Sequence, residues 1–412
     1  MQEQLQRAIV LLEQGRAKDA KKVLIDVLAQ DPNNPDILSL LAQVELSLEN
    51  NEEALKFIEK AINLEPDNAI YFEIKGRIHL TMENNAKAKS ALSKAIELDP
   101  YNDNAFAYLA HILVYEKKFQ EALEMANESL AINAENLFAL NVRSTAQLKL
   151  GHKEESYKTI EGALREDPEN SYTHSNYGWG LLEKGEGKKS MEHFKEALRL
   201  NPNNDHAKAG MAEALKANYW LYRQFLKYSF WMAKMAAKNQ WIFIIAFYFG
   251  YKLISSFAKA NPEWAFITTP LLILLALVAF STWILNPLFN LFLRTNAYGR
   301  HLLDEEDTKN SNLVGASLAI GVIGLIGYFA TKEQWLLYTG VYGVAMMIPF
   351  SRFFSRSKTK NLFKVYGGGL AIVGFLGILS VLLNAQALSI FVSVFILGFI
   401  AYQWVANYQV IE

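Results

Sequence analysis

Apolar and polar residues in the first half of the chain follow the spacing of short amphipathic helices that end in a common way. Segments such as EKAINLEPDN (residues 59–68) and SKAIELDPYN (residues 93–102) place apolar residues three and four apart and then reach a proline. Proline cannot continue a helix, because it lacks the N–H group and its ring clashes with the preceding turn. The prolines recur every 34 residues, at Pro32, Pro66, Pro100, Pro168 and Pro202, with Ala134 in the one gap. This fixed period predicts an array of helical hairpins.

Small residues recur at three places in each 34-residue unit, where they allow two helices to approach closely. They stand at the eighth place (Ala8, Ala42, Gly76, Ala110, Ser144, Gly178), the twentieth (Ala20, Ala54, Ala88, Ala122, Ser156, Ser190) and the twenty-seventh (Val27, Ala61, Ala95, Ser129, Ala163, Ala197). The period, the small columns and the closing proline resemble the tetratricopeptide repeat (TPR) family. The resemblance covers residues 1–204, and residues 205–217 are expected to form a capping helix.

The second half of the chain contains long apolar runs. A helix needs about 20 mostly apolar residues to cross a bilayer, with about 17 as a lower limit. We identify six candidate spans: Trp241–Phe257, Ala265–Leu285, Leu313–Ala330, Trp335–Phe350, Val365–Leu383 and Leu388–Val405. Tryptophan and tyrosine stand at many of their ends, as expected at a headgroup layer. The pattern predicts a multi-span helical membrane domain.

The charge of the chain separates the same two halves. The formal net charge of −1 divides into −9 for residues 1–218 and +8 for residues 219–412. Of the 15 basic residues after residue 218, 12 fall on one side of the predicted membrane and only Lys252, Lys259 and Lys332 on the other. Basic residues favour the cytoplasmic side. We therefore expect the solenoid and the C-terminus to be cytoplasmic, on a plasma or inner membrane.

The pattern of basic and apolar residues in 218–240 predicts an amphipathic connector helix at the membrane interface. Arg223, Lys227, Lys234 and Lys238 fall within about 60° of one helix face, and bulky apolar residues such as Tyr228 and Met232 lie opposite. Such a helix tends to lie in the headgroup layer. A plain continuation of the repeat array is the alternative. Arg352 and Arg356, after the fourth span, are further predicted interface residues.

The residues give little sign of catalysis. Cysteine is absent, which excludes disulfides and cysteine-ligated metals. His301 and Asp304 to Asp307 cluster in one polar loop, and we expect a solvated loop rather than a metal site. The glycines of GASLAIGVIGLIGYFA are expected to serve helix packing, because no strand precedes them. Apart from Lys252, the six spans contain no Asp, Glu, Lys, Arg or His. We expect no metal, no cofactor, no nucleic-acid partner and no enzyme activity.

The TPR resemblance implies a concave surface lined by the first helix of each unit. The second, fifth, ninth and twelfth places of that helix face inward in the family, which here also brings Glu73 and Phe138 to this surface. The candidate partner-binding residues are Gln43, Arg77, His111, Asn141, Thr145, Tyr172 and Trp179. The family's clamp for a terminal carboxylate needs Lys and Asn at the fifth and ninth places. Ser39 with Gln43, or Glu73 with Arg77, does not match it, so that ligand class is not expected.

The sequence thus predicts an all-α protein with three parts: a TPR helical-hairpin solenoid (1–217), a connector (218–240) and a membrane domain of about six spans (241–412). The expected function is protein–protein interaction at a membrane, as a scaffold or assembly factor, with homo-oligomerisation possible. The alternative is a channel or transporter with the repeats as a regulatory domain. A membrane enzyme that acts through the polar connections is a third option.

Overall fold

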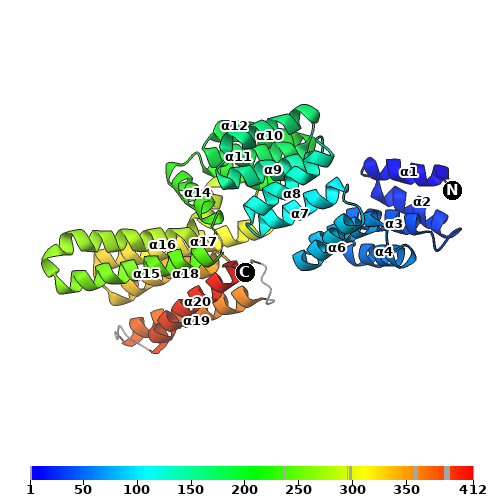
Figure 1. Cartoon of the computed structure of the whole chain (residues 1–412). Helices are drawn as coiled ribbons and strands as arrows, with labels where there is room; N and C mark the ends of the chain where they lie inside the picture. Colours follow the sequence, from blue (N-terminus) through cyan, green and yellow to red (C-terminus); the bar gives the residue numbers. More distant parts are fainter. Residues whose placement is uncertain are drawn as a thin grey trace. The chain divides into compact units, whose positions relative to one another are not determined.

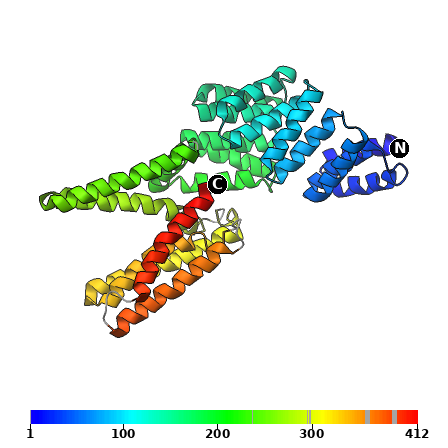
Figure 2. The ribbon, with the colours of Figure 1, turned by 60° about the horizontal axis from the view of Figure 1, so that its bottom comes forward.

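The computed structural model describes residues 2–235, 237–294, 296, 299–355, 361–384 and 390–411, and every regular element within those ranges is a helix. The chain forms two compact units. Unit 1 comprises residues 1–180 with 199–202, and unit 2 comprises residues 181–198 with 203–412. The ribbon is drawn from two sides in Figures 1 and 2. The predicted all-α fold is confirmed.

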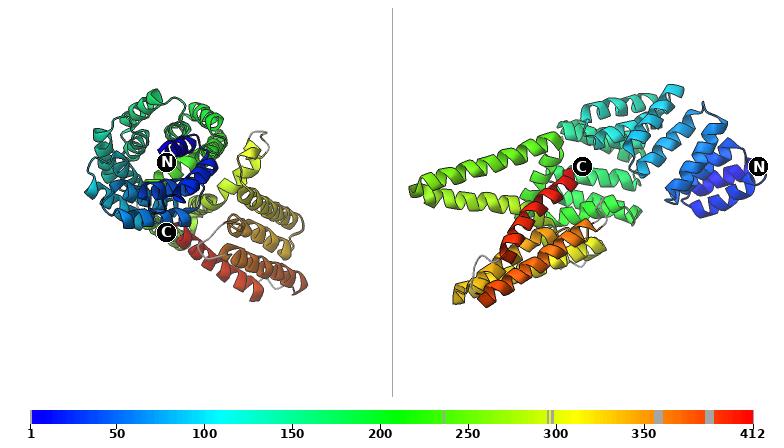
Figure 3. Two further views of the ribbon diagram at one scale, coloured as in Figure 1. Left: turned by 90° about the vertical axis from the view of Figure 1, so that its right-hand side faces the viewer. Right: turned by 90° about the horizontal axis from the view of Figure 1, so that it is seen from below.

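Unit 1 is a row of antiparallel helical hairpins, one for each of the first five predicted repeats, followed by most of the first helix of the sixth. Figure 3 (left) shows that the row is curved. The helices are α1 (Gln2–Glu13), α2 (Ala17–Leu28), α3 (Pro35–Ser47), α4 (Asn51–Leu64), α5 (Ala69–Thr81), α6 (Asn85–Leu98), α7 (Asp103–Tyr115), α8 (Phe119–Ile132), α9 (Leu137–Leu150), α10 (Lys153–Glu166) and most of α11 (Ser171–Lys184). Each pair spans one 34-residue unit, as predicted from the proline spacing.

The three columns of small residues lie in the core of the hairpins. All six members of each column are buried. Gly76 shows why size matters there: a Cβ atom added to it would lie 2.6 Å from Cγ of Leu92 on the second helix of the same hairpin. Real Cβ atoms do not approach other atoms so closely, so the two helices of this hairpin pack with no room for a larger side chain.

The last residue of each repeat caps the first helix of the next one. Asn34, Asn68, Asn102 and Asn136 each accept a hydrogen bond through Oδ1 from a backbone N–H in the first turn of α3, α5, α7 and α9. Asn170 does the same for Thr173 in α11. An asparagine cap satisfies a helix N–H that has no partner within the helix. The cap at Asn136 persists although Ala134 replaces the usual proline before it.

The turn between the two helices of a hairpin also recurs at a fixed place. The fifteenth residue of each unit has a positive φ angle, at Gly15, Glu49, Glu83, Lys117, Gly151 and Gly185. The left-handed conformation suits glycine and costs other residues energy. Three of the six repeats therefore have a strained non-glycine residue at this turn: Glu49, Glu83 and Lys117.

Unit 2 begins within the sixth repeat and contains the apolar half of the chain. Its helices are most of α12 (Gly187–Leu200), α13 (Asp205–Lys216), α14 (Trp220–Ala233), α15 (Ala237–Ala260), α16 (Ala265–Leu293), α17 (Glu305–Thr331), α18 (Gln334–Phe350), α19 (Leu362–Asn384) and α20 (Ile390–Ile411), with short 3₁₀ turns at Pro262–Trp264 and Gly299–His301. Each of the six predicted spans coincides with one helix, from α15 to α20; residues 388 and 389 of the last span lie outside the described residues.

Among the described residues, three stretches are long and apolar enough to cross a membrane: Pro262–Leu293, Glu305–Thr331 and Leu362–Leu383. Ile390–Ala406 is a shorter apolar stretch, and α18 has 17 residues. The connector differs from the single helix expected over 218–240. It consists of α14, which ends at Ala233, and the first residues of α15.

Helices α17 and α18 pack closely through glycines. An added Cβ at Gly324 would lie 2.4 Å from the backbone nitrogen of Gly340, and one at Gly343 would lie 2.3 Å from that of Gly321. Backbone meets backbone at these points, which only small residues allow. The prediction that the glycines of residues 315–327 serve helix packing is confirmed for Gly321 and Gly324.

Candidate partner-binding surface

Five ring side chains form a continuous row along three successive first helices of unit 1. We call Tyr108, His111, Tyr115, Phe138 and Tyr172 the aromatic row. The ring centroids of Tyr108 and Phe138 are 4.9 Å apart, those of His111 and Phe138 5.2 Å, and those of Phe138 and Tyr172 6.3 Å. Tyr115 contacts His111 edge to face at 4.9 Å. The row thus links α7, α9 and α11.

The row has one cationic end. The guanidinium carbon of Arg77, on α5, lies 5.6 Å from the Tyr108 ring centroid, within the range of a cation–π contact. Arg77 also pairs with Glu73 at 3.8 Å, and Glu73 accepts a long hydrogen bond of 3.4 Å from Asn102. Burial raises the pKa of Glu73, while the Arg77 charge and the Asn102 bond oppose that rise. Arg77 is therefore held in place beside the rings.

His111 is a neutral member of the row. Burial lowers the pKa of His111 to about 4, because the charged ring would lose its hydration among apolar neighbours. Its Nδ1 atom is buried, and within the described part of the chain no partner lies within hydrogen-bonding distance of it. At neutral pH this side chain offers a ring surface and uncharged polar atoms.

Exposure divides the row into a buried base and an accessible rim. Tyr115 is 70% exposed and Tyr172 is 39% exposed, whereas Tyr108, His111 and Phe138 are half-buried. Exposed tyrosines supported by a second layer of rings resemble the anchors that carry binding energy at protein interfaces. The arrangement suits apolar or aromatic side chains of a partner, with a carboxylate or other acceptor near Arg77.

Of the predicted contact residues, Asn141 lies inside the wall, and Thr145 bonds back to its own helix. Asn141 is 1% exposed and donates to Leu137 O and to Thr173 Oγ1, while its Oδ1 accepts from Asn176. It therefore joins the fifth and sixth repeats and differs from the expected partner contact. Thr145 donates to the backbone carbonyl of Asn141, one turn earlier. The family's inward-facing fifth place is filled here by a structural amide.

The remaining predicted residues lie around the row or apart from it. Tyr172, Arg77 and His111 belong to the row or contact it. Trp179 is half-buried on α11, and Gln43 is half-buried on α3, two hairpins before the row. Tyr108 and Tyr115 were missed by the sequence analysis, because they occupy the sixth and thirteenth places. Their spacing around His111, three residues before and four after, is a one-face helical pattern that signals them.

Several of the predicted membrane-interface residues contact other groups of the protein and do not form a continuous exposed basic stripe. Arg223 donates to the carbonyls of Ala217 and Asn218, at the end of α13. Lys234 lies 2.6 Å from the carboxylate of Glu183, and Lys227 is exposed. Arg352 is half-buried against Trp283. The Lys238 side chain and Arg356 lie outside the described residues. The interfacial orientation of the connector stays a prediction.

The polar loop around His301 is used for local structure. Asp304 caps α17 by accepting from the N–H of Asp307 at 2.6 Å, and Glu305 pairs with Lys309 at 2.5 Å. Across the described residues, no group of three or more His, Cys, Asp and Glu side chains is placed to hold a metal ion.

Comparison with known proteins addresses the solenoid. Two models described as tetratricopeptide repeat match residues 11–78 and 71–102. No curated protein matches the chain. Similar solved structures include TTC0263, a thermophilic TPR protein of Thermus thermophilus (18% identity, 44% of this chain and 98% of that one, TM-score 0.41) and PilF of Pseudomonas aeruginosa (19%, 52% and 96%, TM-score 0.41). Another is YrrB, titled a TPR protein with an unusual peptide-binding site (20%, 45% and 95%, TM-score 0.33). The two family models identify residues 11–102 as a segment of the tetratricopeptide repeat family.

Proposed function

We propose that this chain is a membrane-anchored scaffold or assembly factor that binds a partner protein through the aromatic row. Tetratricopeptide repeats imply a role in protein–protein interaction, because stacked hairpins present an extended surface instead of a reaction centre. The membrane anchor is supported by the three long apolar helices of unit 2. The basic bias of the connections favours a cytoplasmic solenoid.

One observation carries the choice of surface. Rings from three successive hairpins contact one another and end at a cation, although no such contact is needed to stack the small-residue columns. Exposed tyrosines lose little conformational entropy on binding and offer large contact areas. A partner segment that lies along α7, α9 and α11 would contact Tyr115 and Tyr172 together.

Site-specific photo-crosslinking in intact cells tests this proposal. A crosslinking amino acid is placed at Tyr115 or Tyr172 of the full chain, and the adducts are identified by mass spectrometry. Tyr101 is the matched control, because it is an exposed tyrosine of the same unit, 79% accessible and outside the row. We expect a shared protein adduct at both row positions and none at Tyr101.

A second arm measures dependence on the row. Tyr115→Ala with Tyr172→Ala should weaken capture of that partner about tenfold or more, which corresponds to about 1.4 kcal/mol. Tyr101→Ala should leave capture unchanged, and circular dichroism should show the same helical content in all variants. Identical adducts at Tyr101, or full capture by the double variant, would rule out the aromatic row as the binding surface.

A further inference from the structure

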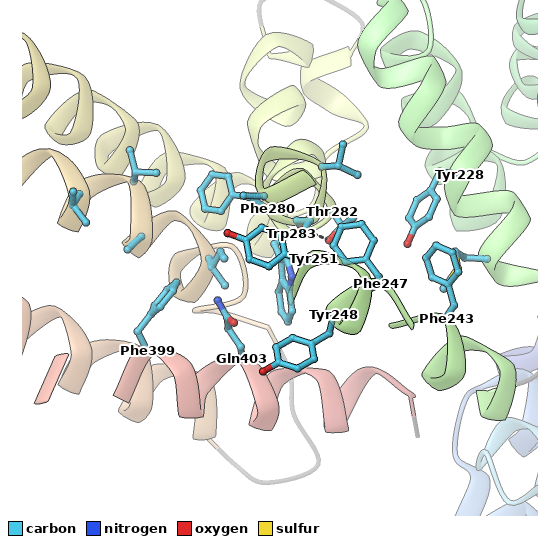
Figure 4. Close-up of a pocket in the computed structure, with 18 of the residues that line it drawn as sticks. Tyr228, Phe243, Phe247, Tyr248, Tyr251, Phe280, Thr282, Trp283, Phe399 and Gln403 are labelled. Atoms are coloured by element: carbon cyan, nitrogen blue, oxygen red, sulfur yellow. Dashed lines mark hydrogen bonds between the residues drawn. The ribbon is translucent and has the colours of Figure 1, made fainter. Parts of the chain in front are cut away.

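Unit 2 contains a large apolar cavity among its helices. Its volume is about 850 Å³, within the range of small-molecule sites, and α14, α15, α16, α18 and α20 supply most of its wall. Figure 4 shows the side chains of Phe247, Phe280, Phe399 and Gln403 around one space. Tyr228 and Met232 of α14 also line it, so the apolar face predicted for the connector covers this cavity.

A second, polar cavity lies beside the first. Its volume is about 420 Å³, and its wall includes Asn286 of α16, Glu306, Asp307 and Asn310 of α17, and Arg352 just after α18. Asn310 is buried, donates to Ser355 and accepts from the N–H of Phe354, so it fixes the segment that carries Arg352. The backbone that carries Arg352 is therefore held against α17.

The two cavities share part of their wall. Thr282 and Trp283, on α16, line both of them. The guanidinium carbon of Arg352 lies 5.4 Å from the Trp283 ring centroid, so a cation stands at the boundary. Two adjoining cavities, one apolar and one charged, are complementary to an amphiphile, with its hydrocarbon in the apolar chamber and its headgroup at the charged mouth.

The charges at the mouth select the headgroup. A guanidinium has five N–H donors in a fork that fits phosphate oxygens, and Arg352 uses one of them, at 3.5 Å, for the carbonyl of Ala406. Glu306 and Asp307, both half-buried, add two carboxylates to the same polar wall. Such carboxylates favour a ligand that also carries a cation with N–H donors. A phosphate joined to a primary ammonium meets both demands.

We propose that unit 2 binds one molecule of a zwitterionic aminophospholipid. Its phosphate lies at Arg352, its ammonium at Glu306 and Asp307, and an acyl chain fills the chamber around Phe247, Phe280 and Phe399. The proposal rests on the membrane location proposed above and is independent of the aromatic row. It gives the membrane half of the chain a specific ligand in addition to its anchoring role.

Native mass spectrometry of the full chain, purified in detergent and stripped of lipid, tests the proposal. Phosphatidylethanolamine, phosphatidylglycerol and phosphatidylcholine with identical acyl chains are titrated separately. We expect one phosphatidylethanolamine molecule to bind about tenfold or more tightly than the other two lipids. Phosphatidylglycerol brings no cation for the carboxylates, and the quaternary ammonium of phosphatidylcholine has no N–H to donate.

Four variants assign the parts of the site. Arg352→Gln should weaken phosphatidylethanolamine binding about tenfold or more, and Glu306→Gln with Asp307→Asn should remove the preference for it. Ala279→Trp fills the chamber and should weaken all three lipids. Leu277→Trp is the matched control, because Leu277 is exposed on the same helix and is not part of the cavity wall. It should bind like the wild type.

The outcomes separate this proposal from the wider one. Equal binding of the three lipids, or wild-type binding by Arg352→Gln and Ala279→Trp, would overturn the lipid site and leave the scaffold proposal standing. A chain that fails to float with membranes in a density gradient would overturn the lipid site together with the membrane anchor. Partner crosslinking at Tyr172 is read separately in both cases.

Discussion

The ammonium group of Lys216 lies 3.2 Å from Oδ1 of Asn290, although the two residues are 74 positions apart. Lys216 is 3% exposed, at the end of α13, and Asn290 is 1% exposed on α16. Lys216 also donates to Glu213 and Asn286, and Tyr222 donates to the second Glu213 oxygen at 2.7 Å. Burial and the Glu213 carboxylate raise the pKa of Tyr222, which therefore stays a hydrogen-bond donor. A buried charge requires such partners.

Removing the cation from this network should destabilise unit 2. Lys216→Ala removes the cationic donor to Glu213 Oε1 and to the side-chain oxygens of Asn286 and Asn290. Breaking a buried pair costs about 3–5 kcal/mol. The double variant Lys216→Met with Glu213→Leu should lose less, because no charge is left unpaired. Thermal unfolding in detergent measures both. Equal loss in the single and double variants would contradict an electrostatic role for Lys216.

The left-handed turns allow a stability test in both directions. Glu83→Gly should stabilise unit 1 by about 1 kcal/mol, because glycine adopts this conformation without the penalty of a side chain. Gly151→Ala should destabilise it by a similar amount. Both positions are exposed, so side-chain packing is not changed. Chemical denaturation followed by circular dichroism gives the two free energies; shifts of the same sign would refute the conformational explanation.

The glycine contact between α17 and α18 should not tolerate one extra methyl group. Gly324→Ala places Cβ against the backbone of Gly340, and such overpacking costs about 1–3 kcal/mol. Gly369→Ala is the matched control, because no atom lies within 4 Å of its added Cβ. The melting temperature in detergent should fall for the first variant only. A similar fall in both would indicate a general effect of alanine in these helices.

The stability of unit 1 should depend on His111 in mild acid. The folded state holds His111 neutral down to pH about 4, whereas the unfolded chain takes up the proton near pH 6.5. The contribution of neutral His111 to the free energy of unfolding is therefore complete above pH 6.5 and is lost as the pH falls toward 4. His79 shifts in the same direction, so His111→Gln should reduce this pH dependence without abolishing it. An unchanged pH profile of the unfolding midpoint would contradict the assignment.

The membrane topology has a direct test. The basic bias predicts that reporters fused at Lys358 and at Glu412 lie in the cytoplasm and that one at Asn261 lies on the outer side. An external signal at Glu412 would mean an odd number of spans. The short helix α18 would then be the first candidate for a helix that does not cross.

The solenoid was predictable because proline, small residues and spacing act locally. Every repeat needs small residues at the same places so that its two helices can pack closely. The columns that contain Gly76 and Ala95 could therefore be located from the sequence. The apolar helices followed from composition for the same reason. Helix contacts such as Gly324 against Gly340 needed only the expectation that small residues meet.

The aromatic row was less predictable, because it depends on contacts between side chains of different repeats. The family's inward columns located Arg77, His111 and Tyr172, but not Tyr108 and Tyr115, which extend the row from neighbouring places. Asn141 occupies an inward place, but its side chain is hydrogen-bonded to Thr173 and Asn176. The spacing of residues in the sequence does not reveal these bonds. Nothing in the sequence marks Lys216 as buried, since only the fold brings Asn286 and Asn290 to it.

The asparagine caps have a consequence for how the length of the array can change. Each cap residue closes one unit and hydrogen-bonds to the helix of the next, so the joint lies at the border of two 34-residue modules. If residues 69–102 were excised, Asn68 would stand directly before Asp103 and could cap α7 as Asn102 does. Duplication or loss of a whole module therefore preserves every joint. The length of the solenoid can therefore change in steps of one hairpin without the loss of a cap.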